Sequence, residues 1–561
     1  MERLHDACGV VGIYAPEHAE SIDVRRYLTL ALTALQHRGQ ESAGMAVYNR
    51  DGKICHRVGM GKVREVFSDT GTGLPPTRTG IGHVRYSTTG SSCVENAGPF
   101  VVGAETGLSE QACYDTIAVA HNGNLVNGEA LRAQLPPELL VSTTDSEAIA
   151  LLLLRANGPT LRERMIATYP LLRGAYSLVM LAEGKLYAMR DPWGMRPLCL
   201  GRIGTIWIVA SESCALERIS ADYVREVEPG ELITIDEQGL HAEVLAREPR
   251  QALCVFEYIY FSDATSQLNG RYVYSVREAL GRELAREHPV EADSVVPVPD
   301  SSIPAALGYA AASGIPYGHA IIKNRYSDRS FIKPDQRLRE LEVDLKFNLV
   351  RPRIQGARLI IVDDSIVRGN TMKRLVAALR HAGVKEIHLR SSAPPLRHPC
   401  YFGIDIPQEQ ELIAAGRSNE QIADYIGVDS LGYLSIAGLG RALNSINASE
   451  QGRVDREQGR VDREQGRVDR EQGRVDREQG RVDREQGTRK GYPYYTTDTF
   501  ATAGSSIVGV PLAGTLSVDD ATATRLLHNE CCYGCMQTRG WPFNPREAQL
   551  MTVTGRAARQ L

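Results

Sequence analysis

The apolar pattern changes from that of a strand to that of a helix within residues 358–381. Residues 359–362 form a continuous, mostly β-branched apolar run, which predicts a buried strand. Asp363 and Asp364 end this run, and a turn of small and polar residues leads to residues 372–381, whose apolar spacing is that of an amphipathic helix. The predicted order is strand, acidic pair, loop and helix.

The predicted loop has the chemistry of a sugar-phosphate site. We expect the backbone N–H groups of residues 365–371 to point into the cup ahead of a helix N-terminus, where unpaired amides and the helix dipole favour a phosphate. Gly369 lets the backbone approach a ligand closely. Ionised Asp363 and Asp364 suit the vicinal hydroxyls of a ribose, or a hard cation such as Mg²⁺. The alternative for an Asp pair alone is a solvated turn.

Other segments of the second half continue the alternation of strand and helix. Residues 294–298 predict another buried strand and residues 276–287 a helix, so we expect a parallel, doubly wound α/β sheet. Ser301 follows the strand at the edge where open α/β sheets bind ligands, and its hydroxyl suits Mg²⁺ or pyrophosphate. Residues 327–346 are polar and rich in arginine, which is typical of a solvated loop.

The first half begins with a strand-like run, residues 8–13, and closes with a hairpin at residues 231–235, so its boundary is expected near Arg250. Cys8 has two interpretations, the first being a core thiol. If residues 1–7 are removed, Cys8 instead carries both a thiol and a free α-amino group. The amine's pKa of about 7.7–8.0 lets it act as a general base beside its own nucleophile.

Four motifs behind Cys8 favour the second interpretation. In chain order they are Gln36-His37-Arg38-Gly39-Gln40-Glu41-Ser42-Ala43-Gly44, Gly82-His83-Val84-Arg85-Tyr86-Ser87-Thr88, His121-Asn122-Gly123-Asn124-Leu125 and Thr144-Asp145-Ser146-Glu147. The series resembles the glutaminase domain of class II amidotransferases. This resemblance implies an α+β N-terminal-nucleophile fold, in which two antiparallel sheets lie between helical layers (αββα).

The same resemblance implies a role for each candidate residue. Acyl transfer from a glutamine amide needs a thiolate, donors for the tetrahedral oxyanion, and charges for the amino-acid head group. Cys8 would be the nucleophile, and the Asn122 side chain with the Gly123 N–H would form the oxyanion hole. Arg85 would hold the substrate carboxylate by a bidentate fork, and Asp145 would hold its ammonium group.

The string Val362-Asp363-Asp364-Ser365-Ile366-Val367-Arg368-Gly369 resembles the phosphoribosyl pyrophosphate signature of type I phosphoribosyltransferases, in the version found in amidophosphoribosyltransferases. Asn370 stands where that family more often has threonine. The resemblance implies that residues 327–346 close over the pyrophosphate and that Mg²⁺ neutralises it. The residues implied in donor and Mg²⁺ binding are Ser301, Lys323, Arg325, Lys346, Asp363, Asp364, Ser365, Arg368, Gly369 and Thr371, with Ser301, Asp363 and Asp364 at the Mg²⁺.

Four of the eleven cysteines require a separate interpretation. Cys532 and Cys535 form a Cys-x-x-Cys pair, which together with the distant Cys254 and Cys400 can hold Zn²⁺ or a 4Fe-4S cluster, or can be four unrelated thiols. Their contexts resemble those of the iron-sulfur subgroup of the family, which also has a cleaved leader. The resemblance implies a structural 4Fe-4S cluster on these four residues, and Cys531 is left as an unassigned neighbour.

A seven-residue repeat, Glu-Gln-Gly-Arg-Val-Asp-Arg, follows the family-like part and occurs five times in residues 450–484. One valine per heptad leaves half of a coiled-coil seam empty, and each glycine costs a helix about 1 kcal/mol. We expect a disordered or marginally helical insertion. Residues 488–530 are rich in Thr, Ala and Gly and show no recognisable chemistry, and the resemblance returns only at Cys532.

Composition limits the remaining possibilities. A chain of 561 residues is too long for one core and predicts two or three domains. A net charge of −4 gives no general nucleic-acid or membrane signature. Because the start lacks a signal-peptide pattern and no apolar run approaches about 20 residues, we expect a cytoplasmic protein that binds neither nucleic acid nor membrane.

These expectations divide the chain into a removed leader (1–7), a glutaminase domain (8–250), a phosphoribosyltransferase domain (251–447), an insertion (448–487) and a C-terminal segment (488–561). The family resemblance implies that glutamine and phosphoribosyl pyrophosphate yield 5-phosphoribosylamine for purine synthesis. It also implies inhibition by purine nucleotides and a homo-oligomer, by resemblance a tetramer. Two alternatives remain open: another class II amidotransferase, such as one for glucosamine phosphate, and a non-catalytic regulator that binds phosphoribosyl pyrophosphate.

Overall fold

The computed structural model describes residues 8–19, 22–67, 72–86, 92–103, 116–246, 248, 250–324, 347–404, 408–446 and 519–537. The chain divides into two units, one made of Met1–Leu443 with Asp520–Leu561 and the other of Asn444–Asp519. The expected leader and the seven-residue repeat both lie outside the described residues. The helices and strands named below all lie in the first unit.

The N-terminal half contains two antiparallel sheets. The first has the order β11-β9-β10-β1-β4-β2-β3 and the second β13-β12-β8-β7-β6-β5. The strands of the first are β1 (Gly9–Tyr14), β2 (Ser42–Tyr48), β3 (Ile54–Met60), β4 (Thr79–Arg85), β9 (Cys199–Ile203), β10 (Ile206–Ala210) and β11 (Asp222–Glu226). Those of the second are β5 (Phe100–Val102), β6 (Ile117–Leu125), β7 (Gly174–Ala182), β8 (Lys185–Arg190), β12 (Glu231–Asp236) and β13 (Gly239–Val244).

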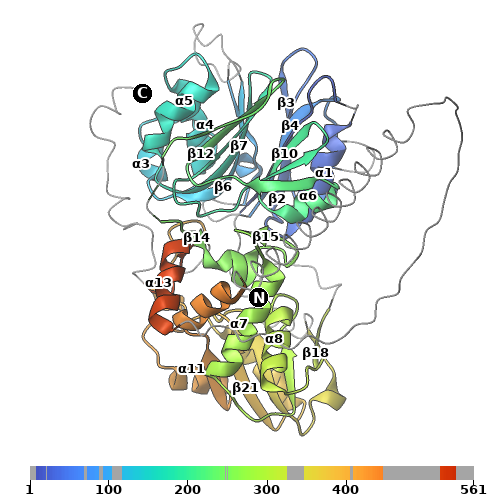
Figure 1. Ribbon diagram of the computed structural model, residues 1–561, viewed down its shortest axis with the longest axis vertical. Coiled ribbons are helices and arrows are strands. Elements are labelled where there is room, and N and C mark those ends of the chain that lie inside the picture. Colours follow the sequence, from blue (N-terminus) through green and yellow to red (C-terminus); the bar gives the residue numbers. More distant parts are fainter. Residues whose placement is uncertain are drawn as a thin grey trace, which may run out of the picture. The chain divides into compact units, whose positions relative to one another are not determined.

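Apolar side chains of both sheets share one core. Val10 and Ile81 of the first sheet pack with Val179 and Leu186 of the second. Gly12 keeps the sheets close, because a Cβ at this position would lie 2.6 Å from Val179. Helices α1 (Val24–Ala34) and α6 (Ser213–Arg218) cover the outer face of the first sheet, and α4 (Asp145–Arg155) and α5 (Leu161–Thr168) cover that of the second (Figure 1). This is the predicted αββα arrangement.

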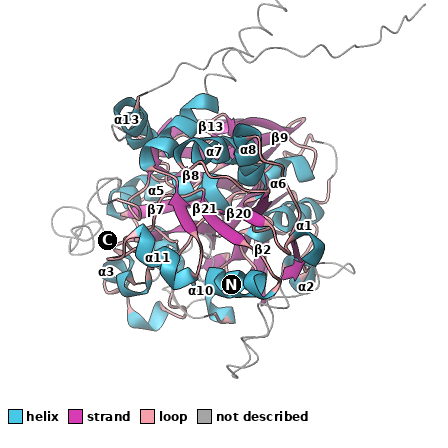
Figure 2. Cartoon of the chain, turned by 90° about the horizontal axis from the view of Figure 1, so that it is seen from below, coloured by secondary structure: helices cyan, strands magenta, loops and turns pink. Residues whose placement is uncertain are grey.

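The second half contains a parallel sheet in the order β17 (Ser294–Pro297), β20 (Arg358–Asp363), β21 (Glu386–Ser391) and β22 (Ser430–Tyr433). Helices α7 (Val273–Glu287) and α8 (Ile303–Ser313) lie on one side of its central strands, and α10 (Asn370–His381) and α11 (Asn419–Ile426) lie on the other (Figure 2). Two short strands, β18 (Ile321–Lys323) and β19 (Phe347–Leu349), pair antiparallel beside it. The predicted doubly wound α/β sheet is confirmed.

The predicted elements differ from the observed ones mainly at their ends. The strand at residues 359–362 is β20, the helix at 276–287 is α7, which starts at Val273, and the helix at 372–381 is α10, which starts at Asn370. The buried residues of α10 recur with helical spacing and form one face of the helix. On this face, Met372, Leu375 and Leu379 pack on Leu359 and Ile361 of the sheet.

The C-terminal segment returns to the start of the second half. Helix α13 (Asp520–Glu530) is followed by β23 (Cys531–Cys532), which pairs in parallel with β14 (Leu253–Cys254). Arg271 forms an ion pair with Glu530 at 2.7 Å. Among the described residues, no helix is long and apolar enough to span a membrane.

Candidate functional site

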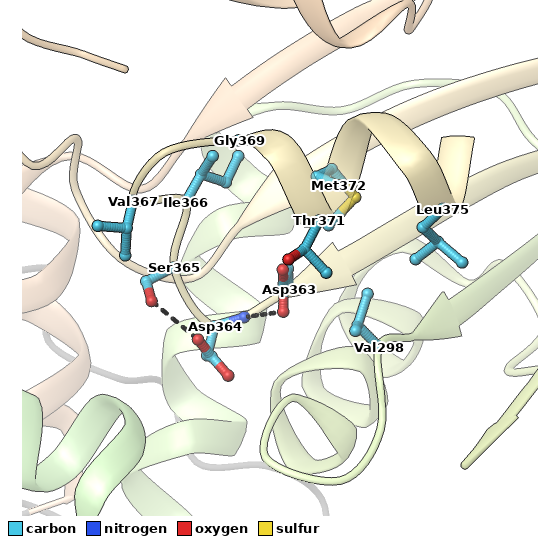
Figure 3. A pocket seen from close by; sticks show the side chains of 10 residues that line it. All are labelled: Val298, Asp363, Asp364, Ser365, Ile366, Val367, Gly369, Thr371, Met372 and Leu375. Carbon is cyan, nitrogen blue, oxygen red and sulfur yellow. Dashed lines mark hydrogen bonds between the residues drawn. The ribbon is translucent and has the colours of Figure 1, made fainter. Parts of the chain in front are cut away.

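The loop between β20 and α10 forms a pocket at the carboxyl edge of the parallel sheet (Figure 3). Gly369 is the N-cap of α10 and has a φ of 79°, the left-handed conformation that glycine adopts without strain. A Cβ at Gly369 would lie 2.4 Å from Ile413. The pocket is lined by Val298, Asp363, Asp364, Ser365, Ile366, Val367, Gly369, Thr371, Met372 and Leu375.

Asp364 is buried and held through both carboxylate oxygens. Its Oδ2 accepts from the Ser301 hydroxyl at 2.5 Å and its Oδ1 accepts from the Ser365 hydroxyl at 2.9 Å. Its backbone N–H donates to Oδ1 of Asp363 at 3.0 Å, as Figure 3 shows. The structure therefore brings Ser301 to the acidic pair, and two carboxylates and a hydroxyl form a cluster of hard oxygen atoms, the donor type that Mg²⁺ prefers, beside the loop that precedes α10.

The two described cationic residues that were predicted to bind the donor, Arg368 and Lys323, contact carboxylates of the protein. Arg368 donates from Nε to Oε2 of Glu411 at 2.7 Å, and Lys323 forms an ion pair with Asp300. Arg325 and Lys346 lie outside the described residues. Of the predicted set, Asp363, Asp364, Ser365, Gly369 and Thr371 line one pocket, and Ser301 contacts Asp364. Arg368 and Lys323 are instead paired with carboxylates.

Cys8 lies directly before β1, and its Sγ is 3.8 Å from the carbonyl oxygen of Tyr86. Its own carbonyl oxygen accepts a hydrogen bond from Nε of Arg38 at 3.1 Å. Burial raises the pKa of the Cys8 thiol, and the positive charges of Arg85 and Arg38 only partly oppose this. A nucleophilic role for Cys8 therefore needs a base that removes the thiol proton.

Asn122 and Gly123 lie on β6 of the second sheet. The Asn122 side chain is fully buried, and neither its Nδ2 nor its Oδ1 has a hydrogen-bond partner among the described residues. An unsatisfied buried polar group costs about 1–3 kcal/mol, so such a group is expected where a ligand supplies the partner. Gly123 tolerates no side chain, because a Cβ would lie 2.0 Å from the carbonyl oxygen of Ala175.

Asp145 and Arg85 lie near Cys8 and are both buried. Asp145 starts α4, accepts from the Leu125 N–H at 2.8 Å, and lies 3.7 Å from Nδ1 of His121. Burial opposes its ionisation, but His121 and the surrounding hydrogen bonds hold the pKa of Asp145 below its usual value. Arg85 ends β4, with Nη1 3.7 Å from Glu41 Oε2. A fixed anion and a fixed cation thus accompany the thiol.

Cys254, Cys400, Cys532 and Cys535 line one cavity, together with Met195, Arg196, Phe402 and Ile404. The parallel pairing of β14 with β23 places Cys254 opposite Cys532, and the Phe402 N–H donates to Sγ of Cys400 at 3.3 Å. Burial raises the pKa of all four thiols, that of Cys532 to about 12. Cys531 pairs with Leu253 and does not line the cavity.

The donor set of the cavity, four cysteines beside a buried arginine, fits an anionic group held by sulfur. In the part of the chain that the structure describes, no group of three or more His, Cys, Asp or Glu side chains is arranged to hold a single metal ion. Arg196 is 1% exposed, lines the cavity, and has an Nε without a hydrogen-bond partner among these residues. A guanidinium beside four sulfur ligands offsets the negative charge that deprotonated thiols bring.

The roles predicted from the sequence did not include three charged residues near these sites, Arg38, Arg196 and Glu257. Arg38 contacts the Cys8 carbonyl, and Arg196 lines the cysteine cavity. Glu257 is fully buried although it is a charged residue. A signal was present for Glu257, since it is the only charge in the apolar run at residues 255–261, where a charge needs a buried partner.

Two domain profiles match the chain, one for a glutamine amidotransferase domain at residues 105–218 and one for a phosphoribosyl transferase domain at residues 273–400. The fold and these matches define a glutamine amidotransferase joined to a phosphoribosyltransferase. An amidophosphoribosyltransferase from Methanothermobacter thermautotrophicus is 47% identical over 440 residues, which cover 78% of this chain and 90% of the relative. The corresponding protein of Bacillus subtilis is 42% identical, with coverage of 78% and 90%.

The chain therefore belongs to the amidophosphoribosyltransferase family. The solved structure of the Bacillus subtilis phosphoribosylpyrophosphate amidotransferase complexed with ADP and GMP superimposes with a TM-score of 0.71 at 41% identity, covering 78% of this chain and 93% of that one. A second solved structure, of the allosteric regulatory enzyme of purine biosynthesis, gives 0.71 at 42% identity, with coverage of 78% and 91%. The chain is thus a purine-biosynthesis glycosyltransferase with a glutamine amidotransferase domain, and neither alternative function is favoured.

Proposed function

We propose that glutamine is hydrolysed at Cys8 and that the released ammonia displaces pyrophosphate from C1 of phosphoribosyl pyrophosphate, giving 5-phosphoribosylamine. The two half-reactions use different sites: the one around Cys8 and Asn122, and the one around Asp363 and Gly369. The observation that carries the proposal is the buried Asn122 amide, which has no hydrogen-bond partner among the described residues, in a chain whose other half places Gly369 at the N-cap of α10.

In the first half-reaction, the Cys8 thiolate attacks the carboxamide carbon of glutamine. The α-amine of Cys8, freed by removal of residues 1–7, takes the thiol proton and passes it to the leaving ammonia. Nδ2 of Asn122 and the N–H of Gly123 hold the oxyanion, and water then releases glutamate from the thioester. Arg85 and Asp145 hold the carboxylate and the ammonium group of glutamine.

In the second half-reaction, the backbone amides of residues 365–371 hold the 5-phosphate and Asp363 and Asp364 receive the ribose hydroxyls or Mg²⁺. Mg²⁺ at Asp363, Asp364 and Ser301 would neutralise the leaving pyrophosphate. Lys323, Arg325, Lys346, Arg368 and Thr371 complete the donor site in this proposal. For this role, pyrophosphate oxygens would replace Glu411 as the partner of Arg368 and Asp300 as the partner of Lys323.

The cavity of Cys254, Cys400, Cys532 and Cys535 would hold a structural 4Fe-4S cluster. When bound, such a cluster links β14, β23 and the segment around Cys400 through sulfur ligands. Purine nucleotides as inhibitors are supported by the Bacillus subtilis relative, which was solved with ADP and GMP. A homotetramer and a cytoplasmic location remain predictions from the sequence.

The test is an assay of pyrophosphate release with the full chain, phosphoribosyl pyrophosphate and Mg²⁺, comparing glutamine with ammonia as the nitrogen source. Release with both sources, and glutamate formation with glutamine, is the expected result. Failure of ammonia to support release by a folded protein would refute the transfer half, and failure of glutamine alone would refute the glutaminase half.

A further inference from the structure

A buried network of four charged side chains joins the two halves of the chain. Arg38, Arg196, Glu212 and Glu257 are each 1% exposed or less. Arg38 contacts Glu257 through two parallel bonds of 2.9 Å and also forms an ion pair with Glu212. Arg196 contacts the same Glu257 at 3.3 Å. Two positive and two negative side chains therefore meet away from water.

The two ends of the network lie at functional sites. At one end, Nε of Arg38 donates to the carbonyl oxygen of Cys8 at 3.1 Å. At the other, Arg196 lines the four-cysteine cavity and donates from Nη2 to the Phe402 carbonyl oxygen at 2.7 Å. The Phe402 N–H in turn donates to Sγ of Cys400 at 3.3 Å. An unbroken series of polar contacts thus runs from the cavity to the backbone of Cys8.

Glu257 is the central link, because both arginines meet on it. It starts the π-helix η6 (Glu257–Phe261), three positions after Cys254. The Ser262 hydroxyl donates to its Oε2 at 2.7 Å, so both carboxylate oxygens are fully engaged. A bidentate guanidinium-carboxylate pair has a fixed planar geometry, and a shift of Glu257 must therefore move Arg38.

We propose that Arg38 is a positioning residue that fixes the carbonyl of Cys8, and that Glu257 and Arg196 tie this position to the four-cysteine cavity. The integrity of the cavity then sets the reactivity of the Cys8 thiol in the other half of the chain. Nε of Arg196, which lacks a partner among the described residues, is the atom that responds when negative charge enters the cavity. The inference rests on the proposed function only in taking Cys8 as the nucleophile.

The experiment compares Arg196→Lys with the full wild-type chain. A lysine keeps the charge but cannot reach Glu257 and the Phe402 carbonyl with two forked donors. Cys8 is alkylated with iodoacetamide and its rate is followed on the N-terminal peptide by mass spectrometry, beside kcat and KM for glutamine hydrolysis. We expect alkylation and kcat to fall at least tenfold, with KM within threefold and ammonia-dependent transfer within twofold of wild type.

The matched control is Arg390→Lys. Arg390 is also a buried arginine that donates to a backbone carbonyl, that of His288, but it lies on β21 outside the network. Its variant should leave Cys8 alkylation within twofold of wild type. If Arg196→Lys does not fold, Glu257→Gln takes its place with the same expected changes, since the amide keeps the shape and loses the charge.

A second measurement perturbs the cavity without touching the network. Cys400→Ser, in the chain as purified, should slow alkylation of Cys8 by about the same factor as Arg196→Lys. Unchanged Cys8 alkylation and glutamine kcat in folded variants would overturn the inference, as would an equal loss of ammonia-dependent transfer. A wild-type chain that neither hydrolyses glutamine nor alkylates at Cys8 would instead overturn the proposed function.

Discussion

The hydroxyl of Ser301 donates a 2.5 Å hydrogen bond to Oδ2 of Asp364, although 63 positions separate them in the sequence. Ser301 follows β17 and Asp364 follows β20, and these strands are parallel neighbours, so their carboxyl ends meet at one edge. Ser365 holds the other oxygen at 2.9 Å. The carboxylate plane of Asp364 is thereby fixed before any ligand arrives.

The first prediction concerns this preorganisation. Ser301→Ala removes a hydrogen bond to an ionised group, which contributes about 1.5–3 kcal/mol, and lets Asp364 rotate. We expect phosphoribosyl pyrophosphate with Mg²⁺ to bind about tenfold more weakly by calorimetry, while glutamine hydrolysis continues. Asp363→Asn combined with Asp364→Asn should remove donor binding altogether, because both hard oxygen ligands lose their charge.

Ser313→Ala is the control, since Ser313 lies at the end of α8, where its hydroxyl donates to the Ala310 carbonyl at 3.4 Å and accepts from the Ile315 N–H at 3.3 Å. The affinity of the Ser313→Ala variant for phosphoribosyl pyrophosphate should equal that of wild type. Unchanged donor affinity in the double Asp variant would contradict the assignment of the acidic pair.

The second prediction separates the two half-reactions. Cys8→Ala should abolish the use of glutamine yet retain transfer from free ammonia, because none of the described residues that line the donor pocket belongs to the first two sheets. Intact-mass measurement of the active wild-type chain should give a start at Cys8. An active protein that retains residues 1–7 would exclude the α-amine as base, since an amine in a peptide bond cannot accept the proton.

The third prediction uses two buried asparagines of the same half. Asn122 has no hydrogen-bond partner among the described residues, so Asn122→Ala should leave thermal stability nearly unchanged. Because it supplies an oxyanion donor in the proposed reaction, kcat for glutamine hydrolysis should fall by about 10²–10³. Thermal unfolding and glutaminase kinetics on the same preparation check both statements.

Asn127→Ala is the matched control, for which we expect the opposite effects on stability and activity. Asn127 donates to the Leu171 carbonyl at 2.9 Å and accepts from the Arg173 N–H at 3.1 Å, so its loss leaves two backbone groups unpaired. This variant should lower the unfolding temperature by a few degrees and keep kcat. A reversed pattern, in which Asn122→Ala destabilises and retains activity, would show that Asn122 is structural.

The sequence was sufficient to predict a site where the residues that form the elements and the residues that carry the chemistry are adjacent in the chain. The apolar run of β20, the acidic pair and the helix after Gly369 are contiguous, so their order predicted the pocket. That Cys254, Cys400, Cys532 and Cys535 share one site was predicted only from the family resemblance. Their position on one cavity depends on the parallel pairing of β14 with β23, which no local sequence pattern encodes.

The buried charge network could not be predicted in the same way. Arg38 lies in the motif at residues 36–44, yet its partner Glu257 is 219 positions away, and nothing in either segment identifies the other. The contact of Arg368 with Glu411 could likewise not be predicted, since the two residues are 43 positions apart in the sequence. Long-range pairing of charges is decided by the whole fold rather than by neighbouring residues.

The fourth prediction is a pH dependence that arises from His83. Burial, reinforced by the nearby Arg85 and His121, lowers the pKa of His83 to about 3. The unfolded chain, with an ordinary histidine pKa near 6.5, therefore binds a proton that the folded chain does not. Stability from this residue is complete above about pH 6.5 and is lost as the pH falls toward 3, by about 1.4 kcal/mol per pH unit at most.

The measurement is the thermal unfolding temperature at pH 7, 6 and 5 for wild type and His83→Gln. The variant starts less stable at pH 7, because a buried ring that fits its site is lost, but its unfolding temperature should fall less steeply with acid. His18→Gln, at an exposed histidine, should follow the wild-type slope. Parallel slopes for wild type and His83→Gln would show that His83 does not govern acid sensitivity.

The last prediction concerns iron in the four-cysteine cavity. Cys254, Cys400, Cys532 and Cys535 line it, whereas Cys531 does not, so the two adjacent cysteines of β23 should behave differently. Protein purified without oxygen should contain about four irons per chain and a brown chromophore. Cys532→Ala should lose both and become less stable, while Cys531→Ala should keep the iron content of wild type. Stoichiometric zinc, or equal iron loss in both variants, would refute a cluster held by these four thiols.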